Sequence, residues 1–418
     1  MIKTPIHDFL VNYNKKARVR CHMPGNKGLE FPHDITEIAG ADSLYESDGI
    51  IAESERTAAR LFGAEKTLYS CSGSTLAIQA MLTLIKTVSG GTVLAANRSV
   101  HRSFVSACAL LDFDVDWIYG EDEVINAIKP DTAAVFINST DYYGKKYDVR
   151  KIAEICDEIP LLVDNAHGAY LTFLGTHPIT QGAAMTADSA HKTLPALTGA
   201  AYLHINDKRF VPDAKAAAAL FGTSSPSYLI LESLDLCNKH IAEGNIKAFE
   251  LIADLKNNLA RAGFPLRESD PLRITADSRE CGYSGFDFAA ELRNNNIECE
   301  FADENCTVLL FSTITAKAET DEVFAAFMKI KQKKPLKPIV YPVLKLEKNI
   351  SIREAVFAHN CAVLHLEEAA GKVCAEIIAP CPPGIPVVMP GEIISAEAVE
   401  LLKGFGVDKI KITEVEKK

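Results

Sequence analysis

The sequence predicts an α/β protein whose central sheet is mainly parallel. Between about residues 60 and 205, short apolar runs alternate with longer amphipathic segments, the pattern of buried strands covered by helices on both faces. A helical pattern follows at about 226–262, and a second alternating region follows at about 266–330. These three observations indicate a large α/β domain and a smaller α/β domain after it.

The apolar runs of the first region are predicted as strands and the amphipathic segments as helices. The predicted strands are 92–96, 115–118, 133–137, 161–163 and 199–204. The predicted helices are 74–88, 101–111, 121–128 and 148–157. Ligands of such sheets bind beyond the carboxyl ends of the strands, so polar residues that follow these runs are candidate site residues.

The second half of the chain is organised around one long helix and a lysine-rich linker. The segment 263–265 contains glycine and proline and ends the predicted helix 226–262, and the small domain is expected to hold a helix at 286–294 and a strand at 307–312. We place the domain limits at 1–40 for an N-terminal arm, 41–240 for the large domain, 241–332 for the small α/β domain and 333–418 for a C-terminal α+β domain.

Composition disfavours several classes of function. The 418 residues are 48% hydrophobic and carry a net charge of −11, which favours a globular enzyme and disfavours nucleic-acid binding. The 11 cysteines show no metal-binding spacing, so we expect reduced thiols, a cytoplasmic location and no bound metal. No apolar stretch is long enough for a membrane span, and the first residues lack the apolar core of a signal peptide.

Lys192 and Asp164 carry the strongest chemical signal. Lys192 lies in a segment of small and polar residues, and Asp164 ends the apolar run 160–163. A lysine amine can bind the aldehyde of pyridoxal phosphate (PLP) covalently, and a carboxylate can keep the pyridine nitrogen of that cofactor protonated. The pair fits a PLP site, although two such residues alone do not specify one.

Three further groups of residues fit the same cofactor. The segment 70–75, which includes Gly73, Ser74 and Thr75, precedes a predicted helix, where free backbone N–H groups favour a phosphate, although an ordinary helix cap explains it as well. His101 follows the predicted strand 92–96 and could lie flat on a pyridine ring, although a histidine there is usually a surface or capping residue. The polar side chains beside Lys192 are those of Ser189 and His191.

The order of these motifs resembles that of the ornithine/lysine/arginine decarboxylase family, whose members are fold-type I PLP enzymes. Further matching pieces lie at 21–28, 222–228, 382–386 and 390–392, so the resemblance extends over nearly the whole chain. The chain departs from the usual family pattern at Asn26, where histidine is usual, and at 42–46. Both departures lie outside the predicted cofactor residues, so they concern the identity of the substrate more than the binding of PLP.

The resemblance implies a role for each matching residue. Lys192 would bind the cofactor covalently, Asp164 would pair with the pyridine nitrogen, and His101 and Ala166 would pack on opposite faces of the ring, with His167 close by. The residues implied in phosphate binding are Gly73, Ser74, Thr75, Ser189 and His191.

The resemblance also implies a homodimer and a reaction. In fold-type I enzymes a site borrows residues from the partner subunit, and the candidates here are Thr223, Ser224 and Ser225, which are equally well explained as a turn before a helix that starts at Pro226. The implied reaction removes the carboxylate of lysine, ornithine or arginine and yields carbon dioxide and a polyamine-type amine. The sequence does not choose among these three substrates.

The substrate residues are the least determined part of the prediction. Glu392 is our candidate for binding the distal cationic group, and an acid near a helix start explains it equally well. A second enzyme class, a PLP aminotransferase or lyase, would use an arginine such as Arg273 or Arg293 to hold the substrate carboxylate. A non-catalytic PLP-binding regulator is the alternative from another class.

Overall fold

The large domain is built on a seven-stranded, mainly parallel sheet. The computed structural model describes residues 2–16, 19–244, 246–380 and 386–414, so most of the motif at 382–386 lies outside the described residues. The strand order is β1-β7-β6-β5-β4-β2-β3. The strands are β1 (Lys66–Ser70), β2 (Val93–Asn97), β3 (Asp114–Ile118), β4 (Thr132–Asn138), β5 (Leu161–Asp164), β6 (Met185–Asp188) and β7 (Ala201–Ile205).

The mainly parallel arrangement predicted from the sequence is confirmed. Strand β7 pairs antiparallel with both β1 and β6, and the remaining neighbours pair in parallel. All five predicted strands are present, but β1 and β6 escaped prediction. Strand β1 reads Lys-Thr-Leu-Tyr-Ser and β6 reads Met-Thr-Ala-Asp, so polar residues interrupt the apolar pattern although both strands are almost fully buried.

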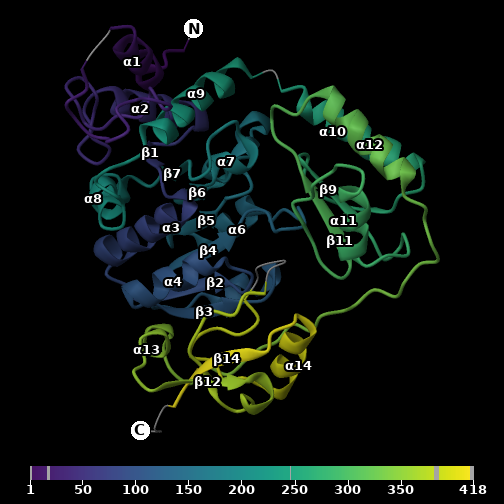
Figure 1. Cartoon of the computed structure of the whole chain (residues 1–418). Coiled ribbons are helices and arrows are strands. Elements are labelled where there is room, and N and C mark those ends of the chain that lie inside the picture. The colour runs from purple at the N-terminus through teal and green to yellow at the C-terminus, as the bar shows by residue number, and fades with distance from the viewer. Residues whose placement is uncertain (1, 17–18, 245, 381–385, 415–418) are drawn as a thin grey trace.

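Helices cover both faces of this sheet (Figure 1). Alternate residues of β2 show the two layers, since Leu94 and Ala96 pack against α3 (Gly73–Leu84) and α4 (Arg102–Leu111), whereas Ala95 packs on the opposite face. The helices of that opposite face are α5 (Val124–Ala127) and α6 (Val149–Cys156). The remaining helices of the arm and the large domain are α1 (Pro5–Asn14), α2 (Ile50–Phe62), α7 (Ala190–Thr193), α8 (Ala214–Ala219) and α9 (Tyr228–Glu243).

The single long helix predicted at 226–262 is wrong, because the structure contains two helices there. Helix α9 ends at Glu243 and α10 (Ala248–Arg261) begins after a break. Gly244 stands at the break with a φ of 66°, a left-handed conformation that glycine adopts without a Cβ clash. The amphipathic pattern continues on both sides of this glycine and hides the change of direction.

The small domain is an antiparallel sheet with helices, and it follows α10. Its strand order is β10-β11-β9-β8, and Figure 1 shows α10 beside α12 against this sheet. The elements are β8 (Leu266–Arg267), β9 (Arg273–Asp277), α11 (Gly285–Arg293), β10 (Phe301–Ala302), β11 (Cys306–Leu310) and α12 (Lys317–Lys329). The helix predicted at 286–294 and the strand predicted at 307–312 correspond to α11 and β11.

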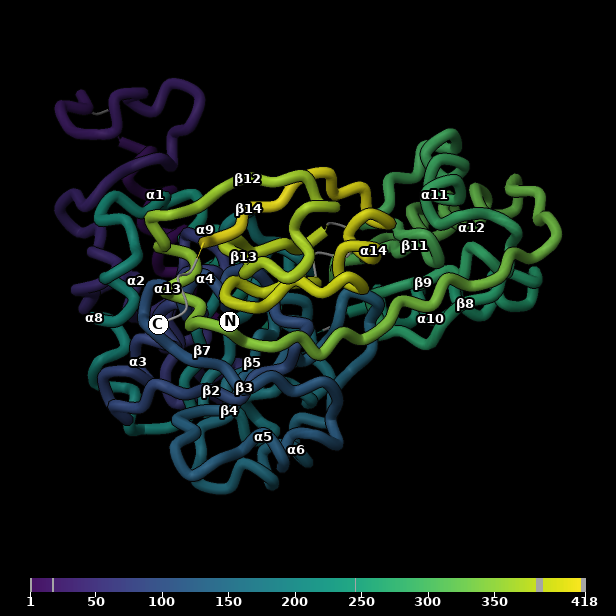
Figure 2. Tube along the Cα trace, turned by 90° about the horizontal axis from the view of Figure 1, so that it is seen from below, coloured from purple at the N-terminus to yellow at the C-terminus, as the bar shows by residue number. Residues whose placement is uncertain are grey.

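A C-terminal unit with its own sheet completes the chain. Residues 331–347 form neither helix nor strand, and Figure 2 shows this stretch running from the small domain to the C-terminal unit. The elements are α13 (Ile352–Val356), β12 (Cys361–His365), β13 (Val373–Cys374), α14 (Ala396–Gly404) and β14 (Lys409–Thr413), with strand order β12-β14-β13.

Short helical turns connect the longer elements along the chain. They are the π turn Ile85–Ser89 and the 3-10 turns Glu121–Glu123, Ala169–Leu174, Pro178–Gln181, Lys208–Phe210 and Leu366–Glu368. Within the described part of the chain, no helix combines the length and the apolar character needed to cross a bilayer.

A buried ion pair joins the C-terminal unit to the large domain. Arg98, directly after β2, donates through Nη2 to the Glu392 carboxylate at 2.8 Å and to the Val387 carbonyl at 3.0 Å. The Glu392 carboxylate also accepts the Met389 N–H at 2.8 Å, and the Arg98 guanidinium lies over the Trp117 ring at 5.1 Å. Burial raises the pKa of Glu392, and the charge of Arg98 opposes that rise. The pair fixes the C-terminal unit beside the end of β2.

We expect Glu392→Ala to lower the free energy of unfolding by about 3–5 kcal/mol, because it leaves the Arg98 guanidinium buried without its counter-charge. Urea denaturation measures the change. Glu400→Ala removes an exposed acid from α14 and should change stability by less than about 0.5 kcal/mol. Equal effects of the two substitutions would contradict a structural role for the buried pair.

Candidate active site

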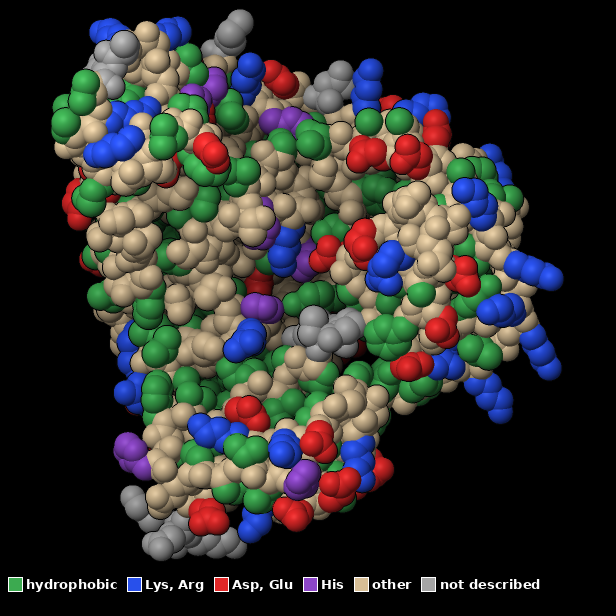
Figure 3. Space-filling model, in the orientation of Figure 1, with side chains coloured by type: hydrophobic (Ala, Val, Ile, Leu, Met, Phe, Trp, Pro, Cys, Tyr) green, Lys and Arg blue, Asp and Glu red, His purple; other side chains and the backbone are tan. Residues whose placement is uncertain are grey.

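Lys192 and Asp164 face one small cavity at the carboxyl ends of β4, β5 and β6. The cavity has a volume of about 40 Å³, and Figure 3 shows a hollow in the middle of the molecular face where histidine and basic side chains gather. The lining residues are Ser74, His101, Asn138, Thr140, Tyr142, Asp164, Ala166, His167 and Lys192. Motifs that are far apart in the sequence therefore meet at the edge of the sheet where ligands of such folds bind.

Lys192 is held in the one-turn helix α7, which follows β6. Its Nζ lies 3.1 Å from Nε2 of His167. Burial lowers the pKa of Lys192, although the charges of Asp164 and Glu300 act in the opposite direction. A lowered pKa increases the fraction of neutral amine, which is the nucleophilic form of a lysine.

Asp164 ends β5 with its carboxylate buried. Its Oδ1 accepts the Ala166 N–H at 3.0 Å. Burial raises the pKa of Asp164, and the charge of Lys192 opposes this rise. Within the described residues, neither lysine nor arginine forms a close ion pair with this carboxylate. A buried carboxylate in this state is suited to pair with a cation that enters the cavity, such as a protonated ring nitrogen.

A buried network behind Asp164 holds the end of β5 in place. Asn165 donates through Nδ2 to Asp188 Oδ2 at 2.7 Å and accepts the Ser139 hydroxyl at 2.5 Å. His177 donates through Nε2 to the same Asp188 oxygen at 2.7 Å. Burial alone would raise the pKa of Asp188, but the charge and hydrogen bond of His177 lower it overall. Because each partner is fixed, the backbone on both sides of Asp164 has little freedom.

Two histidines line the cavity in their neutral form. His101 caps α4, since its Nδ1 accepts the Ser103 N–H at 3.2 Å, and it faces the cavity at the same time. Burial, with the charges of Lys192 and Arg102, lowers the pKa of His101 to about 4. Burial also lowers the pKa of His167 well below its usual value, again assisted by Lys192. The capping role and the site role of His101, which the sequence left as alternatives, are compatible.

The segment predicted to hold phosphate forms one end of the site. Helix α3 begins at Gly73, and its first turn carries Ser74, whose hydroxyl accepts a 3.0 Å hydrogen bond from Ser189. Thr75 is exposed in the same turn and does not line the cavity, and His191 donates to the Ala200 carbonyl at 3.0 Å. The structure thus brings Ser74 and Ser189 together and places the other three candidates around them.

Four residues near the cavity were not found from the sequence. Asn138 ends β4, and Thr140 and Tyr142 follow it, so the position at a strand end was the signal that could have identified them. The ring of Tyr142 meets the ring of His167 edge-on at 5.3 Å and that of Phe301 at 6.2 Å. The fourth residue, Glu300, directly precedes Phe301 and acts electrostatically on Lys192. It comes from the small domain, so no local motif could place it here.

Orphaned polar atoms around the cavity provide a test of whether a polar cofactor fits. Asn138 Oδ1, Thr140 Oγ1 and His167 Nδ1 are buried and have no hydrogen-bond partner among the described residues. Unpaired buried polar atoms are costly, and because these three line the cavity, a polar ligand bound there can pair with them. The donor set, with a lysine amine at one side and a carboxylate at another, fits PLP.

The small domain contacts the lysine-bearing turn directly. Thr313 donates its backbone N–H to the carbonyl of Thr193, the residue after Lys192, at 2.9 Å. The Thr313 hydroxyl is in turn hydrogen-bonded to His240 Nε2 at 2.9 Å. One backbone hydrogen bond therefore connects the small domain to α7.

The two arginines of the alternative aminotransferase interpretation lie in different environments. Arg273 is buried on β9, where Nη1 donates to the Asp141 carbonyl at 2.7 Å and lies 3.1 Å from the Asp270 carboxylate. Its charge acts on Lys192 and His167, although it does not line the cavity. Arg293 is exposed and pairs with Glu298, which is inconsistent with a role as a substrate clamp.

The predicted substrate and partner residues do not reach this cavity in the single chain. Glu392 is engaged in the buried ion pair with Arg98 and does not line the cavity. It also lies before Ser395, which caps α14, so the helix-start interpretation does not describe it either. Thr223, Ser224 and Ser225 are exposed, and their predicted contribution to a partner subunit stays a prediction.

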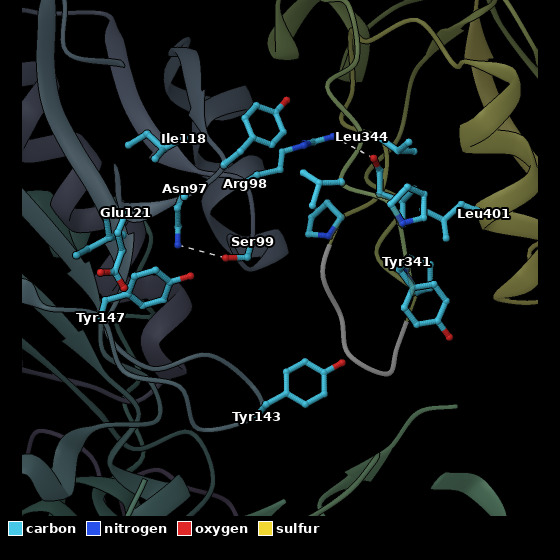
Figure 4. Close-up of a pocket in the computed structure, with 18 of the residues that line it drawn as sticks. Asn97, Arg98, Ser99, Ile118, Glu121, Tyr143, Tyr147, Tyr341, Leu344 and Leu401 are labelled. Carbon is cyan, nitrogen blue, oxygen red and sulfur yellow. Dashed lines mark hydrogen bonds between the residues drawn. The ribbon is translucent and has the colours of Figure 1, made fainter. Parts of the chain in front are cut away.

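A larger cavity of about 370 Å³ lies beside the candidate site, between the large domain and the C-terminal unit (Figure 4). Its walls are mostly apolar and include the rings of Tyr143, Tyr147 and Tyr341, and a hydrogen bond joins Asn97 to Ser99 on one side. No lysine is among its described lining residues. The smaller cavity has the reactive groups, and we take it as the active site.

Family models and known proteins match nearly the whole of this chain. The model of the Orn/Lys/Arg decarboxylase major domain matches residues 29–130 and 121–261, and the model of the C-terminal domain of that family matches 343–407. The YaaO protein of Bacillus subtilis (strain 168) is 29% identical, with 96% of this chain and 94% of that protein covered. The arginine decarboxylase of Bacillus anthracis is 28% identical, with 96% and 92% covered.

The solved structures show the fold. The lysine decarboxylase LdcF of Francisella novicida superimposes with a TM-score of 0.82 at 17% identity, covering 99% of this chain and 81% of that one. A mainly parallel sheet with a lysine-bearing turn after β6, followed by a separate small domain, defines a fold-type I enzyme. The chain belongs to the Orn/Lys/Arg decarboxylase family, which makes it an amino-acid decarboxylase.

The low pKa of His101 predicts a pH dependence of stability in the cofactor-free protein. The folded-state pKa of about 4 lies below the value of about 6.5 in an unfolded chain, so the unfolded chain binds the proton first. The free energy of unfolding should therefore fall as the pH drops from about 6.5 towards 4, and His101 should contribute up to about 3 kcal/mol to that fall. Urea denaturation at several pH values measures it.

The contribution is isolated by comparing variants. His101→Asn should make the pH dependence shallower, whereas His365→Asn, which changes an exposed histidine, should leave it unchanged. An NMR titration midpoint for His101 near 6.5 would contradict the assigned neutral state.

Proposed function

We propose that this protein is a PLP-dependent decarboxylase that acts on a basic amino acid, namely lysine, ornithine or arginine. The observation that carries the proposal is the cavity in which the amine of Lys192 and the carboxylate of Asp164 are both buried, with neutral histidines beside them. The arginine decarboxylase and lysine decarboxylase names among the relatives support a basic substrate.

The described residues suit PLP at each of its functional groups. Lys192 would hold the aldehyde carbon, Asp164 would pair with the pyridine nitrogen, and His101 and Ala166 line the cavity where the ring would lie. The hydroxyls of Ser74 and Ser189 and the start of α3 would take the phosphate, with Gly73, Thr75 and His191 close by. When bound, the cofactor supplies an electron sink for the bond to the substrate carboxylate.

The residues of this chain then control protons and water. The lowered pKa of Lys192 increases the fraction of neutral amine, and the contact with His167 Nε2 at 3.1 Å gives a route for exchanging a proton. Either group could return a proton to the substrate Cα after carbon dioxide leaves. Asp164 keeps its charge when a cation pairs with it, because that attraction offsets the cost of burial.

A carboxylate from the small domain is our candidate for the distal cationic group of the substrate. Glu300 is exposed and forms no ion pair among the described residues, yet its charge acts on Lys192. Its neighbour Phe301 contacts Tyr142, which packs on His167, so this part of the small domain borders the cavity. Glu392, the candidate from the sequence, already neutralises Arg98.

We also propose a homodimer as the functional unit and a cytoplasmic location. Thr223, Ser224 and Ser225 are exposed immediately before α9 and would reach the site of a partner subunit. The hydroxyls of all three could hydrogen-bond to a phosphate there. Analytical ultracentrifugation at the concentration of the activity assay tests the assembly.

The reaction is tested by supplying PLP-loaded protein with carboxyl-labelled lysine, ornithine and arginine. We expect labelled carbon dioxide and an equimolar amine from at least one of them. Lys192→Ala should abolish turnover, because the covalent link to the cofactor is lost, whereas Lys239→Ala changes an exposed lysine on α9 and should not. Borohydride reduction of the wild type should leave a pyridoxyl mass on the peptide that contains Lys192.

Other products would favour the alternatives. A keto acid that forms with an acceptor would indicate an aminotransferase, and PLP binding without turnover of any amino acid would indicate a regulator. A pyridoxyl label on a different lysine would overturn the assigned site.

Glu300→Gln should raise KM for basic substrates by about tenfold or more, because a charge-assisted hydrogen bond contributes about 1.5–3 kcal/mol. PLP affinity should not change. Glu298→Gln is the matched control, since Glu298 is exposed two residues away and pairs with Arg293. A raised KM in Glu392→Gln together with an unchanged KM in Glu300→Gln would restore Glu392 as the distal residue.

A further inference from the structure

Three side chains at the junction of the N-terminal arm and α9 converge outside the active site. His7 on α1 and His33 in a turn of the arm both donate through Nδ1 to the carboxylate of Glu232 on α9. The distances to Oε1 are 2.6 Å from His7 and 2.8 Å from His33, and His33 also lies 2.8 Å from Oε2. The three potential ligand atoms all lie within 4.8 Å of one another.

Glu232 is unusual among the buried glutamates of the described residues because it lacks a permanent cation. Glu55 pairs with Lys215 at 2.7 Å, and Glu392 pairs with Arg98 at 2.8 Å. The side chain of Glu232 is 11% exposed, and its ion-pair partners are the two imidazoles. A buried carboxylate is stable when it pairs with a cation or coordinates a metal. Because the partners of Glu232 are imidazoles and not a lysine or arginine, a metal ion would supply the positive charge that this carboxylate lacks.

We propose that His7, His33 and Glu232 form a site for a divalent transition-metal ion, with zinc as the preferred occupant. Two imidazole nitrogens and a carboxylate oxygen are ligands that zinc favours, and a water molecule would complete a tetrahedral shell. The side chains of His7 and His33 are 34% and 26% exposed, which leaves a path for the ion and room for that water.

The two histidine–glutamate separations need little adjustment to hold the ion. Zinc bonds of about 2.0–2.1 Å place tetrahedral ligand atoms about 3.3 Å apart, so the observed separations of 2.6–2.8 Å would widen by roughly half an ångström. Each imidazole would present the Nδ1 lone pair to the metal and carry its proton on Nε2. No electron transfer or other reactant is required.

The backbone around His7 is already fixed for this role. Asp235, one turn after Glu232 on α9, accepts the backbone N–H groups of Ile6 and His7 at 2.9 and 3.0 Å. These bonds anchor the start of α1 to α9 before any ion binds. A metal would therefore bind a largely preformed site and would add a bond from α9 to the turn that carries His33.

A second cluster of histidine and aspartate side chains differs, because hydrogen bonds within the protein already satisfy its carboxylate. His177, Asp188 and His204 also bring ligand atoms within 4.8 Å of one another, but all three are buried. Asp188 is satisfied there by hydrogen bonds from His177, Asn165 and Thr186. That cluster has no solvent-facing side and serves the active-site network, so the inference does not extend to it.

The proposal is tested by titrating Zn²⁺ into PLP-loaded protein and following heat by calorimetry. Cys21→Ser is used as the background, because Cys21 is an exposed thiol and thiolates are zinc ligands that would compete with the proposed site. We expect one equivalent of zinc per chain from this site. His33→Gln and Glu232→Gln should each weaken that binding at least tenfold, whereas His365→Gln, at an exposed histidine on β12, should not.

Two further readouts separate metal binding from folding. Zinc should raise the unfolding temperature of the wild type and leave that of His33→Gln unchanged, with both unfolding at similar temperatures in the absence of zinc. In a crystal soaked with zinc, an anomalous peak at the zinc edge should lie about 2 Å from His7 Nδ1, His33 Nδ1 and a Glu232 oxygen. Unchanged zinc affinity in both variants, or a peak confined to cysteine thiols, would overturn the proposal.

Discussion

The cost of removing two opposite charges from water is the constraint on which the rest of this structure depends. Lys192 and Asp164 face the same cavity, and burial shifts both pKa values towards the neutral forms. A site that keeps both groups dry must also hold them rigidly, because relaxation or water entry would relieve the strain that makes them reactive. The parallel sheet meets this need, since the ends of β5 and β6 are buried and adjacent.

The surroundings of the pair follow the same constraint. The histidines that line the cavity are neutral, so they add hydrogen-bonding groups without adding buried charge. The network of Asn165, Asp188 and His177 lies behind β5 and saturates its polar groups internally. Three of the buried polar atoms without a hydrogen-bond partner line the cavity, namely Asn138 Oδ1, Thr140 Oγ1 and His167 Nδ1. The network behind β5 is thus paired within the protein, whereas these three atoms are available to a ligand that enters the cavity.

The sequence predicted much of this arrangement because the relevant signals are local. Strands covered on both faces appear as apolar runs, and Lys192 and Asp164 stand in short motifs with recognisable chemistry. Strands β1 and β6 were missed because threonine, serine and aspartate interrupt their patterns, and the break at Gly244 was missed because amphipathic residues continue on both sides. Glu392 shows the limit for site residues, because its partner Arg98 is 294 positions away in the chain. A local pattern cannot distinguish a carboxylate that awaits a substrate from one that is already neutralised.

The hydrogen bond from Thr313 to the carbonyl of Thr193 has a mechanical consequence. This carbonyl belongs to the residue directly after Lys192, and its donor belongs to the small domain. A rotation of the small domain must either break this bond or displace the turn that carries the reactive amine. The position of the Lys192 Nζ atom is therefore coupled to the orientation of the small domain through this one hydrogen bond.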